Sequence, residues 1–360
     1  HELESVYFIE PLVQTLQRLH TNGPIFMKED GTRWNWQGVS AFSLAYDIAT
    51  GQEPKVIAFL DWCVANDVTI VRVFTTAVNM FDLDPGTGRD AAGRILQLAR
   101  DRGLYVELVG LADTAQRAFD HRDHLDRLGD LALRYTNSLI EIANEPNHET
   151  QAPEAKDPIY LLSLGNMVPA EVPLSSGASH GADDENPIYW HLDYATVHGD
   201  RKGGWDSVRH TREMQRIRDN GHVMPVVNDE PDRNLTSDQH LGMSLLCRIF
   251  SLGDTVHLAG LRYSQIPQGD ELLAFNARQR GWNAVPKDWT GRYSRATLAG
   301  DPIVSLDDSQ VLRAYSSLRE NEGYVVGLGV KSDSSIRFGN GWSGTFQIDE
   351  GQARLWHVTR

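Results

Sequence analysis

Short apolar runs alternate with longer helical segments along most of the chain, and this alternation limits the possible folds more than any other feature. Continuous apolar runs are typical of parallel strands that are covered on both faces. The predicted strands span residues 37–42, 68–74, 104–109, 138–143, 172–176, 194–198, 223–228 and 256–261. The predicted helices span residues 54–66, 91–102, 121–134, 154–166, 205–219, 237–251 and 270–281.

Strands that alternate with helices in this way predict an α/β fold, a (β/α)8 TIM barrel. The alternative is an open doubly wound sheet. No GxGxxG or GxxxxGK[ST] motif follows any predicted strand, so the usual nucleotide sites of such a sheet are missing. A predicted hairpin with its turn at Asp30-Gly31 precedes the first strand and is expected to close the bottom of the barrel.

The sequence changes character after the last predicted helix. Alternating β-type runs, separated by turn clusters such as ENEG and GNGWSG, fill residues 303–360. They predict a small antiparallel β module packed on the barrel. We therefore expect a barrel domain, with the hairpin included, over residues 1–300 and a small β domain over 301–360. The module is expected to brace the barrel rather than bind a ligand of its own, because it is short and has few aromatic residues besides Trp342 and Trp356.

Length and charge narrow the class of protein. The 360 residues suffice for one barrel of about 250 residues and an appendage. A net charge of −15 disfavours nucleic acid and anionic membranes as partners. No apolar run approaches the roughly 20 residues that span a bilayer. Cys63 and Cys247 are predicted to be buried free thiols. A secreted or periplasmic location is expected in preference to the cytoplasm.

Two acidic motifs follow the fourth and seventh predicted strands. Asn144-Glu145-Pro146 ends the fourth, and Asn228-Asp229-Glu230-Pro231 ends the seventh. Functional groups of βα barrels gather at the carboxyl ends of the strands. Proline pushes the residue before it toward an extended backbone, which is expected to direct Glu145 and Glu230 into the barrel mouth. Because side chains alternate along a strand, we expect only one of Asp229 and Glu230 to face inward, and we favour Glu230.

Two converging carboxylates suit the hydrolysis of a glycosidic bond. One carboxyl group protonates the departing oxygen, and in a retaining enzyme the other attacks the anomeric carbon from about 5–5.5 Å away. Strands four and seven face each other across an eight-stranded barrel, so Glu145 and Glu230 can meet over its axis. The resulting prediction is a pair of catalytic glutamates.

The sequence resembles glycoside hydrolase clan A, the cellulase- and mannanase-like barrels of family 5 and relatives. IEIANEP (140–146) matches the clan's acid/base motif after strand four, and VVNDEP (226–231) matches its nucleophile motif after strand seven. VTIVRVF resembles its second strand and WQGVSAF its first, so the resemblance covers residues 24–282.

The resemblance implies a role for several individual residues. It implies Glu145 as acid/base, Glu230 as nucleophile, Asn144 as the partner of the sugar 2-hydroxyl and Arg72 beneath the nucleophile. His198 falls on the aromatic or histidine position after strand six. The sequence departs from the clan at two places. Strand three ends in GLAD without the histidine of many family 5 enzymes, and strand eight lacks the usual Trp, for which Tyr263 is the candidate substitute.

Further candidate site residues are three aromatic residues and a group of potential metal ligands. Aromatic rings stack on the flat C–H faces of sugars, so Trp205, Tyr263 and Trp289 are candidate substrate-binding residues, with core packing as the alternative. His198, His180 and Asp113 together could suggest a metal, as in amidohydrolase barrels. Those barrels need a His-x-His after strand one, which is absent here, so we expect neither a metal nor another cofactor.

The sequence thus predicts a retaining glycoside hydrolase that cleaves a β-linked, glucan- or mannan-like oligo- or polysaccharide. The predicted partner is the carbohydrate substrate, with no nucleic acid and no membrane. Two alternatives stay open: a non-catalytic carbohydrate-binding barrel and a metal-dependent barrel hydrolase.

Overall fold

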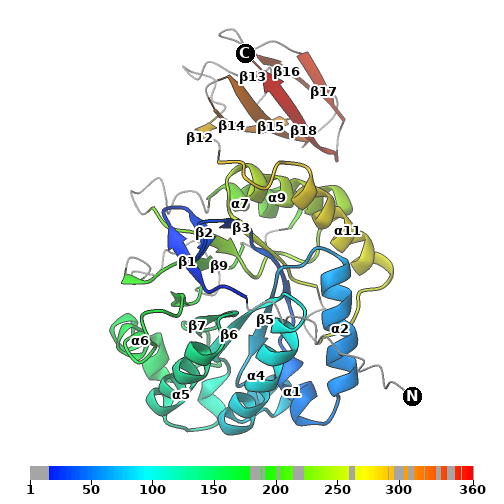
Figure 1. Cartoon of the computed structure of the whole chain (residues 1–360). Coiled ribbons are helices and arrows are strands. Elements are labelled where there is room, and N and C mark those ends of the chain that lie inside the picture. The colour runs from blue at the N-terminus through cyan, green and yellow to red at the C-terminus, as the bar shows by residue number, and fades with distance from the viewer. Residues whose placement is uncertain are drawn as a thin grey trace, which may run out of the picture.

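The protein is described here from a computed structural model of the chain. The structure describes residues 16–178, 188, 191–199, 201, 203–213, 223–258, 264–290, 292–295, 304–306, 312–319, 321–329, 334–338, 345–349 and 351–359. Within these residues the predicted (β/α)8 barrel with a C-terminal antiparallel module is confirmed (Figure 1).

Eight parallel strands form the barrel in the order β8-β7-β6-β5-β4-β11-β10-β9. The strands are β4 Gln37–Ser40, β5 Ile70–Phe74, β6 Tyr105–Leu111, β7 Ser138–Ala143, β8 Leu174–Ser175, β9 Ala195–Val197, β10 Val226–Asn228 and β11 Gly253–Val256. The short β8 and β9 end the ladder. Ser175 Oγ lies 3.3 Å from Thr196 Oγ1, and the amide of Asp193 donates to the Leu174 carbonyl at 3.0 Å, so the barrel is nearly closed.

Strand eight differs most from its prediction. It was predicted over 256–261, but β11 ends at Val256. The strand begins with Gly253-Asp254-Thr255, a sequence that resembles a turn. Asp254 nevertheless lies inside the strand and is 1% exposed. Its carboxylate pairs with Arg278 and accepts a hydrogen bond from Trp282 Nε1 at 2.8 Å. Because these partners come from the covering helix α11, a charged residue is tolerated in a buried strand.

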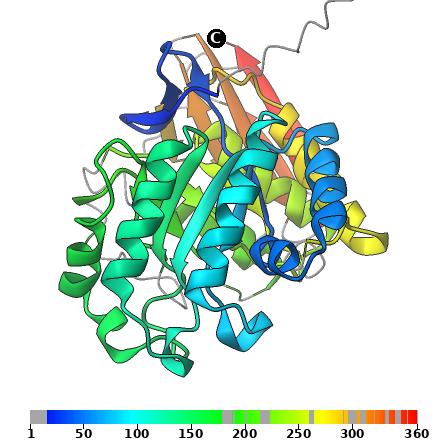
Figure 2. The ribbon, with the colours of Figure 1, turned by 60° about the horizontal axis from the view of Figure 1, so that its bottom comes forward.

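Helices surround the strands on the outside of the barrel (Figures 1 and 2). They are α1 Leu44–Ala49, α2 Glu53–Ala65, α3 Val78–Phe81, α4 Pro85–Arg100, α5 His121–Arg134, α6 Pro158–Gly165, α7 Gly204–Glu213, α9 Ser237–Ile249 and α11 Gly269–Asn283, with 3-10 turns η1 Thr114–Gln116 and η2 Pro153–Lys156. Several begin at side-chain caps. The Asp84 carboxylate accepts from the amides of Gly86 and Thr87, and Thr236 forms a capping box with Gln239.

The predicted hairpin closes the amino-terminal end of the barrel. Strands β1 Leu19–Asn22, β2 Ile25–Lys28 and β3 Arg33–Trp34 form an antiparallel sheet, with the turn at Asp30-Gly31 as predicted. Gly31 has φ of +81°, a conformation that favours glycine. Phe26 and Trp34 pack with Tyr105 and Tyr194 in one buried cluster. This aromatic plug leaves the carboxyl ends of the strands as the open face.

The C-terminal module consists of two antiparallel sheets. One holds β12 Arg292–Arg295, β14 Leu312–Leu318, β15 Glu322–Gly329 and β18 Ala353–Thr359, and the other holds β13 Val304–Leu306, β16 Ser334–Phe338 and β17 Thr345–Ile348. Since β12 pairs with β14, the module's sheet begins before residue 301, the predicted boundary.

The module and the barrel share a hydrophobic core. Met243 of α9, Val326 and Leu328 of β15 and Ala353 of β18 belong to one buried cluster. At Gly242, an added Cβ would lie 2.9 Å from a Leu328 methyl carbon, so a larger residue there would require the Leu328 side chain to shift. This packing favours the expected bracing role.

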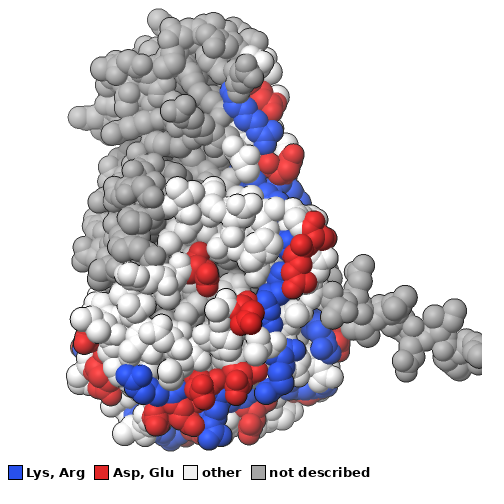
Figure 3. Space-filling model, turned by 60° about the vertical axis from the view of Figure 1, so that its left-hand side comes forward, with Lys and Arg blue, Asp and Glu red and all other residues white. Residues whose placement is uncertain are grey.

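Three further properties concern the chain as a whole. Cys63 and Cys247 are both buried free thiols, as predicted. Among the helices of the described residues, none has the length and apolar character needed to span a membrane. On the face in Figure 3, Lys and Arg lie interspersed with Asp and Glu.

Candidate active site

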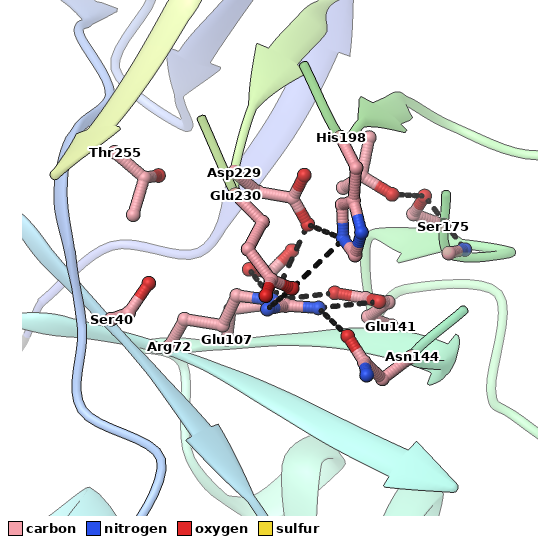
Figure 4. Close-up of polar contacts among 12 residues, drawn as sticks. Ser40, Arg72, Glu107, Glu141, Asn144, Ser175, His198, Asp229, Glu230 and Thr255 are labelled. Carbon is pink, nitrogen blue, oxygen red and sulfur yellow. Dashed lines mark hydrogen bonds and ion pairs between the residues drawn. The ribbon is translucent and has the colours of Figure 1, made fainter. Parts of the chain in front are cut away.

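Polar side chains from four strands converge at the open end of the barrel (Figure 4). Arg72 comes from β5, while His198 follows β9. Asn144 and Glu145 follow β7, and Asp229 and Glu230 follow β10. The structure therefore brings together the two glutamates that the sequence selected, with Asn144, Arg72 and His198 around them.

Glu145 has an unusual backbone conformation. Its φ is +45°, in the left-handed region that non-glycine residues seldom occupy. The expectation that Pro146 makes it extended is therefore wrong. The carbonyl of Asn144 accepts a hydrogen bond from Gln151, and the amide of His148 donates to the Glu145 carbonyl at 2.8 Å, so a tight turn holds this conformation. Backbone strain of this kind is common at functional sites.

His198 bridges the two glutamates. Its Nδ1 lies 2.9 Å from Glu145 Oε1, and its Nε2 lies 3.2 Å from Glu230 Oε2. One carboxyl oxygen of Glu145 and one of Glu230 lie within 4.8 Å of each other. The two side chains are 12% and 10% exposed, so both reach the surface of a largely enclosed site.

Arg72 lies beneath the two glutamates and is only 1% exposed. Its Nε and Nη2 each donate to a Glu141 carboxyl oxygen at 2.8 Å, a two-bond fork that fixes the guanidinium. Nη2 also donates to Asn144 Oδ1 at 2.9 Å, and Nη1 lies 3.4 Å from Glu230 Oε2. Arg72 thus positions both Asn144 and Glu230.

Asp229 and Glu230 both contact Arg72, contrary to the expectation that only one faces inward. Asp229 Oδ2 lies 3.3 Å from Arg72 Nε. The reason is that β10 ends at Asn228, whose amide contacts Met243 on the outer helix α9, so strand alternation does not extend to the next two residues. Asp229 is fully buried, whereas Glu230 reaches the cleft.

Opposing effects set the pKa values of His198 and Glu230. Burial alone would lower the pKa of His198, but Glu230, Asp229 and Glu145 outweigh it and raise the pKa well above its usual value. Burial alone would raise the pKa of Glu230, but His198, His257, Arg72 and Arg201 outweigh it and hold the pKa well below its usual value. The arrangement favours an imidazolium between an ionised Glu230 and Glu145.

Two acidic residues below the mouth were missed by the sequence analysis. Burial and the neighbouring Glu141 raise the pKa of Glu107 well above its usual value, and burial raises the pKa of Glu141 to about 7 despite Arg72. Tyr194 lies between two oxygens, Glu107 Oε1 at 2.8 Å and the Ile140 carbonyl at 3.2 Å. The Tyr194 hydroxyl donates to Glu107 Oε1, and a protonated Glu107 retains an oxygen that accepts this bond. The sequence signal for these two residues was a charged side chain inside each of the apolar runs 104–109 and 138–143.

His257 and Arg201 also reach Glu230 and were not predicted. His257 Nδ1 lies 3.6 Å from Glu230 Oε1 and 3.4 Å from Ser40 Oγ, and Arg201 Nη2 lies 3.0 Å from the same Glu230 oxygen. His257 directly follows the corrected end of β11, where strand-eight functional residues belong. Burial lowers the pKa of His257 to about 3.

The structure does not bring the predicted tryptophans to this site. Trp289 is 1% exposed and packs edge-on against Tyr324 of the module, with Arg319 over its ring. Trp205 packs near Gly242 in the core shared with the module. Trp289 is enclosed, so the packing alternative holds for it, whereas Trp205 is partly buried against the same core. Tyr263 and His180 lie outside the described residues.

Phe42 and Phe74 form the apolar floor beside Arg72. Their rings stack at 4.0 Å, and the guanidinium carbon lies 5.2 Å and 5.6 Å from their centroids. Both are almost fully buried, so they support Arg72 rather than present a stacking surface.

Two groups of side chains have ligand atoms close enough to share a cation. They are Glu141, His198 and Asp229, and Glu145, His198 and Glu230. The Arg72 guanidinium contacts carboxylates of both groups and thereby supplies the positive charge that a metal would bring. A second cation in the deeper group would lie against Arg72 and the imidazolium, so these residues fit a metal poorly.

Comparison with known proteins relates the fold to glycoside hydrolases. No family model and no curated protein matches the sequence. A glycoside hydrolase family 5 structure from Bacteroides vulgatus matches over 100% of this chain and 95% of its own, with a TM-score of 0.70 and 12% identity. A β-glucanase of Saccharophagus degradans in complex with cellotetraose matches over 76% and 97%, with a TM-score of 0.56 and 14% identity.

A Thermomonospora fusca β-mannanase in complex with mannotriose matches over 71% of this chain and 88% of its own, with a TM-score of 0.51 and 17% identity. At such identities these likenesses concern the fold. The chain has the barrel fold of the family 5 glycoside hydrolases, as the motif resemblance implied.

Proposed function

We propose that the protein is a retaining glycoside hydrolase acting on a β-linked oligo- or polysaccharide, with Glu230 as nucleophile and Glu145 as acid/base. One observation carries the proposal: carboxyl oxygens of the two glutamates lie within 4.8 Å of each other at the open end of the barrel. In an inverting enzyme the two carboxyl groups lie about 6.5–9.5 Å apart, which leaves room for a water molecule. The shorter spacing here suits direct attack on the anomeric carbon by one carboxylate.

The reaction proceeds by double displacement. Glu230 attacks the anomeric carbon while Glu145 gives its proton to the departing glycosidic oxygen, which forms a glycosyl-enzyme ester and frees the first product. Glu145 then removes a proton from water, and the resulting hydroxyl attacks the anomeric carbon and releases Glu230. The configuration is inverted twice and therefore retained.

The surrounding contacts support these roles. Arg72 and His198 favour the ionised form of Glu230, as a nucleophile requires. Because Arg72 Nη2 donates to Asn144 Oδ1, the amide nitrogen of Asn144 is the group left to donate to a sugar hydroxyl. His198 contacts Glu145 Oε1 and can stabilise its carboxylate after proton transfer.

The proposed substrate is a glucan- or mannan-like polysaccharide, and the proposed location is secreted or periplasmic. The motif resemblance supports both sugars, and the structural neighbours above include a β-glucanase and a β-mannanase. Catalysis by carboxylates alone needs no cofactor.

The test is a panel of β-glucans, β-mannans and aryl β-glycosides, with wild type, Glu145→Gln and Glu230→Gln. We expect turnover by wild type and a loss of about 10³-fold or more in each variant, because each loses a group that acts in the chemical step. Glu154→Gln, at an exposed glutamate of η2, is the matched control and is expected to retain activity.

Three outcomes bear on the alternatives. Retention is read by nuclear magnetic resonance from the first-formed anomer, and an inverted anomer would contradict the mechanism. Zero turnover by all three proteins, with saccharide binding intact, would favour a non-catalytic binding barrel. Loss of activity with a chelator would favour a metal-dependent hydrolase.

A further inference from the structure

Arg201 approaches the proposed nucleophile from the solvent side. Its Nη2 lies 3.0 Å from Glu230 Oε1, and its side chain is 44% exposed. Arg72, which is 1% exposed, approaches the other oxygen, Oε2, from inside the barrel. Glu230 thus lies between one fixed arginine below and one accessible arginine in the cleft.

The charge of Glu230 is already compensated without Arg201. Oε2 contacts Arg72 at 3.4 Å and His198 at 3.2 Å, both from nearly buried side chains. An ion pair with a half-exposed arginine adds little stability, because water screens it and the long side chain loses freedom. Neutralising the charge of Glu230 therefore does not by itself explain why an arginine occupies position 201.

Arg201 also covers the oxygen that a substrate needs. Arg72 and His198 contact Oε2, whereas Oε1 has the closer contact with Arg201 and a longer one, 3.6 Å, with the buried His257. A sugar placed for attack by Oε1 must therefore displace the Arg201 guanidinium. Glu230 is the only partner that the described part of the chain offers Arg201. A displaced guanidinium leaves a planar fork of donors in the cleft beside the sugar, and this fork matches a carboxylate or a sulfate.

We propose that Arg201 is a specificity-determining residue that binds an anionic group on the sugar whose anomeric carbon Glu230 attacks. The substrate class is then a β-linked glycan with a carboxylate or sulfate on that sugar, and this inference rests on the proposed function. The contact lies within one sugar ring of the attacked carbon. The chain's net charge of −15 repels an anionic substrate only at long range, because salt screens the repulsion beyond about 8 Å.

The test compares sugars that differ only in the anionic group. The probes are β-1,4-linked glucotetraose and mannotetraose, each neutral, oxidised at C6 to the uronic acids, or sulfated at O6. Binding is measured by calorimetry in Glu145→Gln protein, which keeps the Arg201–Glu230 pair but is not expected to turn over. The readout is the ratio of the neutral to the anionic dissociation constant.

We expect a ratio of about 10 or more for the oxidised or the sulfated form, because a charged hydrogen-bonded contact is gained. The form with the larger ratio identifies the group. Adding Arg201→Gln should reduce the ratio to about 1, and Arg201→Lys should restore part of it. Arg94→Gln removes an arginine of similar exposure, 39%, from the outer helix α4 and should leave the ratio unchanged.

A ratio near 1 in the parent protein, or an equal loss of neutral and anionic binding with Arg201→Gln, would overturn the inference. Hydrolysis of the same probes by the otherwise unchanged protein separates the two proposals. Cleavage with no preference for the anionic form leaves the hydrolase and refutes the role of Arg201. Selective binding without cleavage refutes the hydrolase and supports Arg201.

Discussion

The Nδ1 atom of His198 lies 2.9 Å from Glu145 Oε1, so a residue after strand six directly contacts the proposed acid/base after strand four. The opposite ring nitrogen faces Glu230. One imidazole therefore couples the two carboxylates, and its removal should affect both steps of the reaction.

His198→Gln should lower kcat/KM by about 10- to 100-fold, because a charged hydrogen bond of roughly 1.5–3 kcal/mol is lost while the shape is kept. Steady-state kinetics on the best substrate of the panel measures this. His357→Gln, an exposed histidine of the module, serves as control. Equal rates for wild type and His198→Gln would refute the coupling.

Arg72→Met should lower the free energy of unfolding by about 3–5 kcal/mol, because it leaves the buried carboxylates of Glu141 and Asp229 without their cation. Arg72→Lys keeps a charge but cannot span both Glu141 oxygens, so it should fall between wild type and Arg72→Met. Urea unfolding gives the three values. An Arg72→Lys protein as stable as wild type would show that charge alone suffices.

Glu107→Gln should be tolerated better than Glu141→Gln. A glutamine mimics the neutral acid at residue 107, and its amide oxygen can still accept the hydrogen bond from the Tyr194 hydroxyl. At residue 141 it breaks the fork to Arg72, which should reduce the free energy of unfolding by about 1.5–3 kcal/mol. Urea unfolding at neutral pH ranks the two variants, and the reverse order would contradict the protonation assigned to Glu107.

The raised pKa of Glu107 also predicts that the stability of the protein depends on pH. Because the pKa of Glu107 is raised in the folded protein, its contribution to stability is complete below the unfolded value of about 4.3 and is lost as pH rises toward the folded pKa. Glu107→Gln removes this loss, so its stability relative to wild type should increase from pH 4 to pH 8. A difference that is constant across this range would be inconsistent with a raised pKa.

Leu328→Ala should lower the free energy of unfolding by about 2–4 kcal/mol, since it opens a cavity between β15 and α9. Urea denaturation followed by fluorescence measures the change. Leu273→Ala, at a side chain that is 57% exposed on α11, should have little effect.

Deletion of residues 303–360 should cost solubility if the module braces the barrel, whereas weaker binding to insoluble glycan alone would indicate recognition.

The apolar runs predicted the barrel well because a parallel strand covered on both faces leaves a simple pattern. The same simplicity explains the errors. Asp254 interrupts the eighth run, which moved the predicted strand end past His257 and hid that residue. Glu107 and Glu141 were passed over because their signal, a charged residue inside an apolar run, does not tell a strand glutamate that meets a buried arginine from one that faces water.

The glutamates could be selected because proline-flanked motifs at strand ends mark them, and the resemblance to clan A added their roles. The surroundings of Trp205 and Trp289 could not be predicted, since a tryptophan that follows a strand can face either a cleft or a second layer of structure. Here the module supplies that layer. Arg201 lies in a loop, where sequence periodicity carries no information about direction.

Helix α9 begins soon after the nucleophile loop and is enclosed, with β11 on one side and β15 and β18 on the other. A gene exchange that joined this barrel to another accessory module at residue 300 would strip the outer face of that helix. The barrel and the module are therefore expected to have been inherited together. Recombination should succeed only where the incoming sheet places an apolar side chain against Gly242 as Leu328 does.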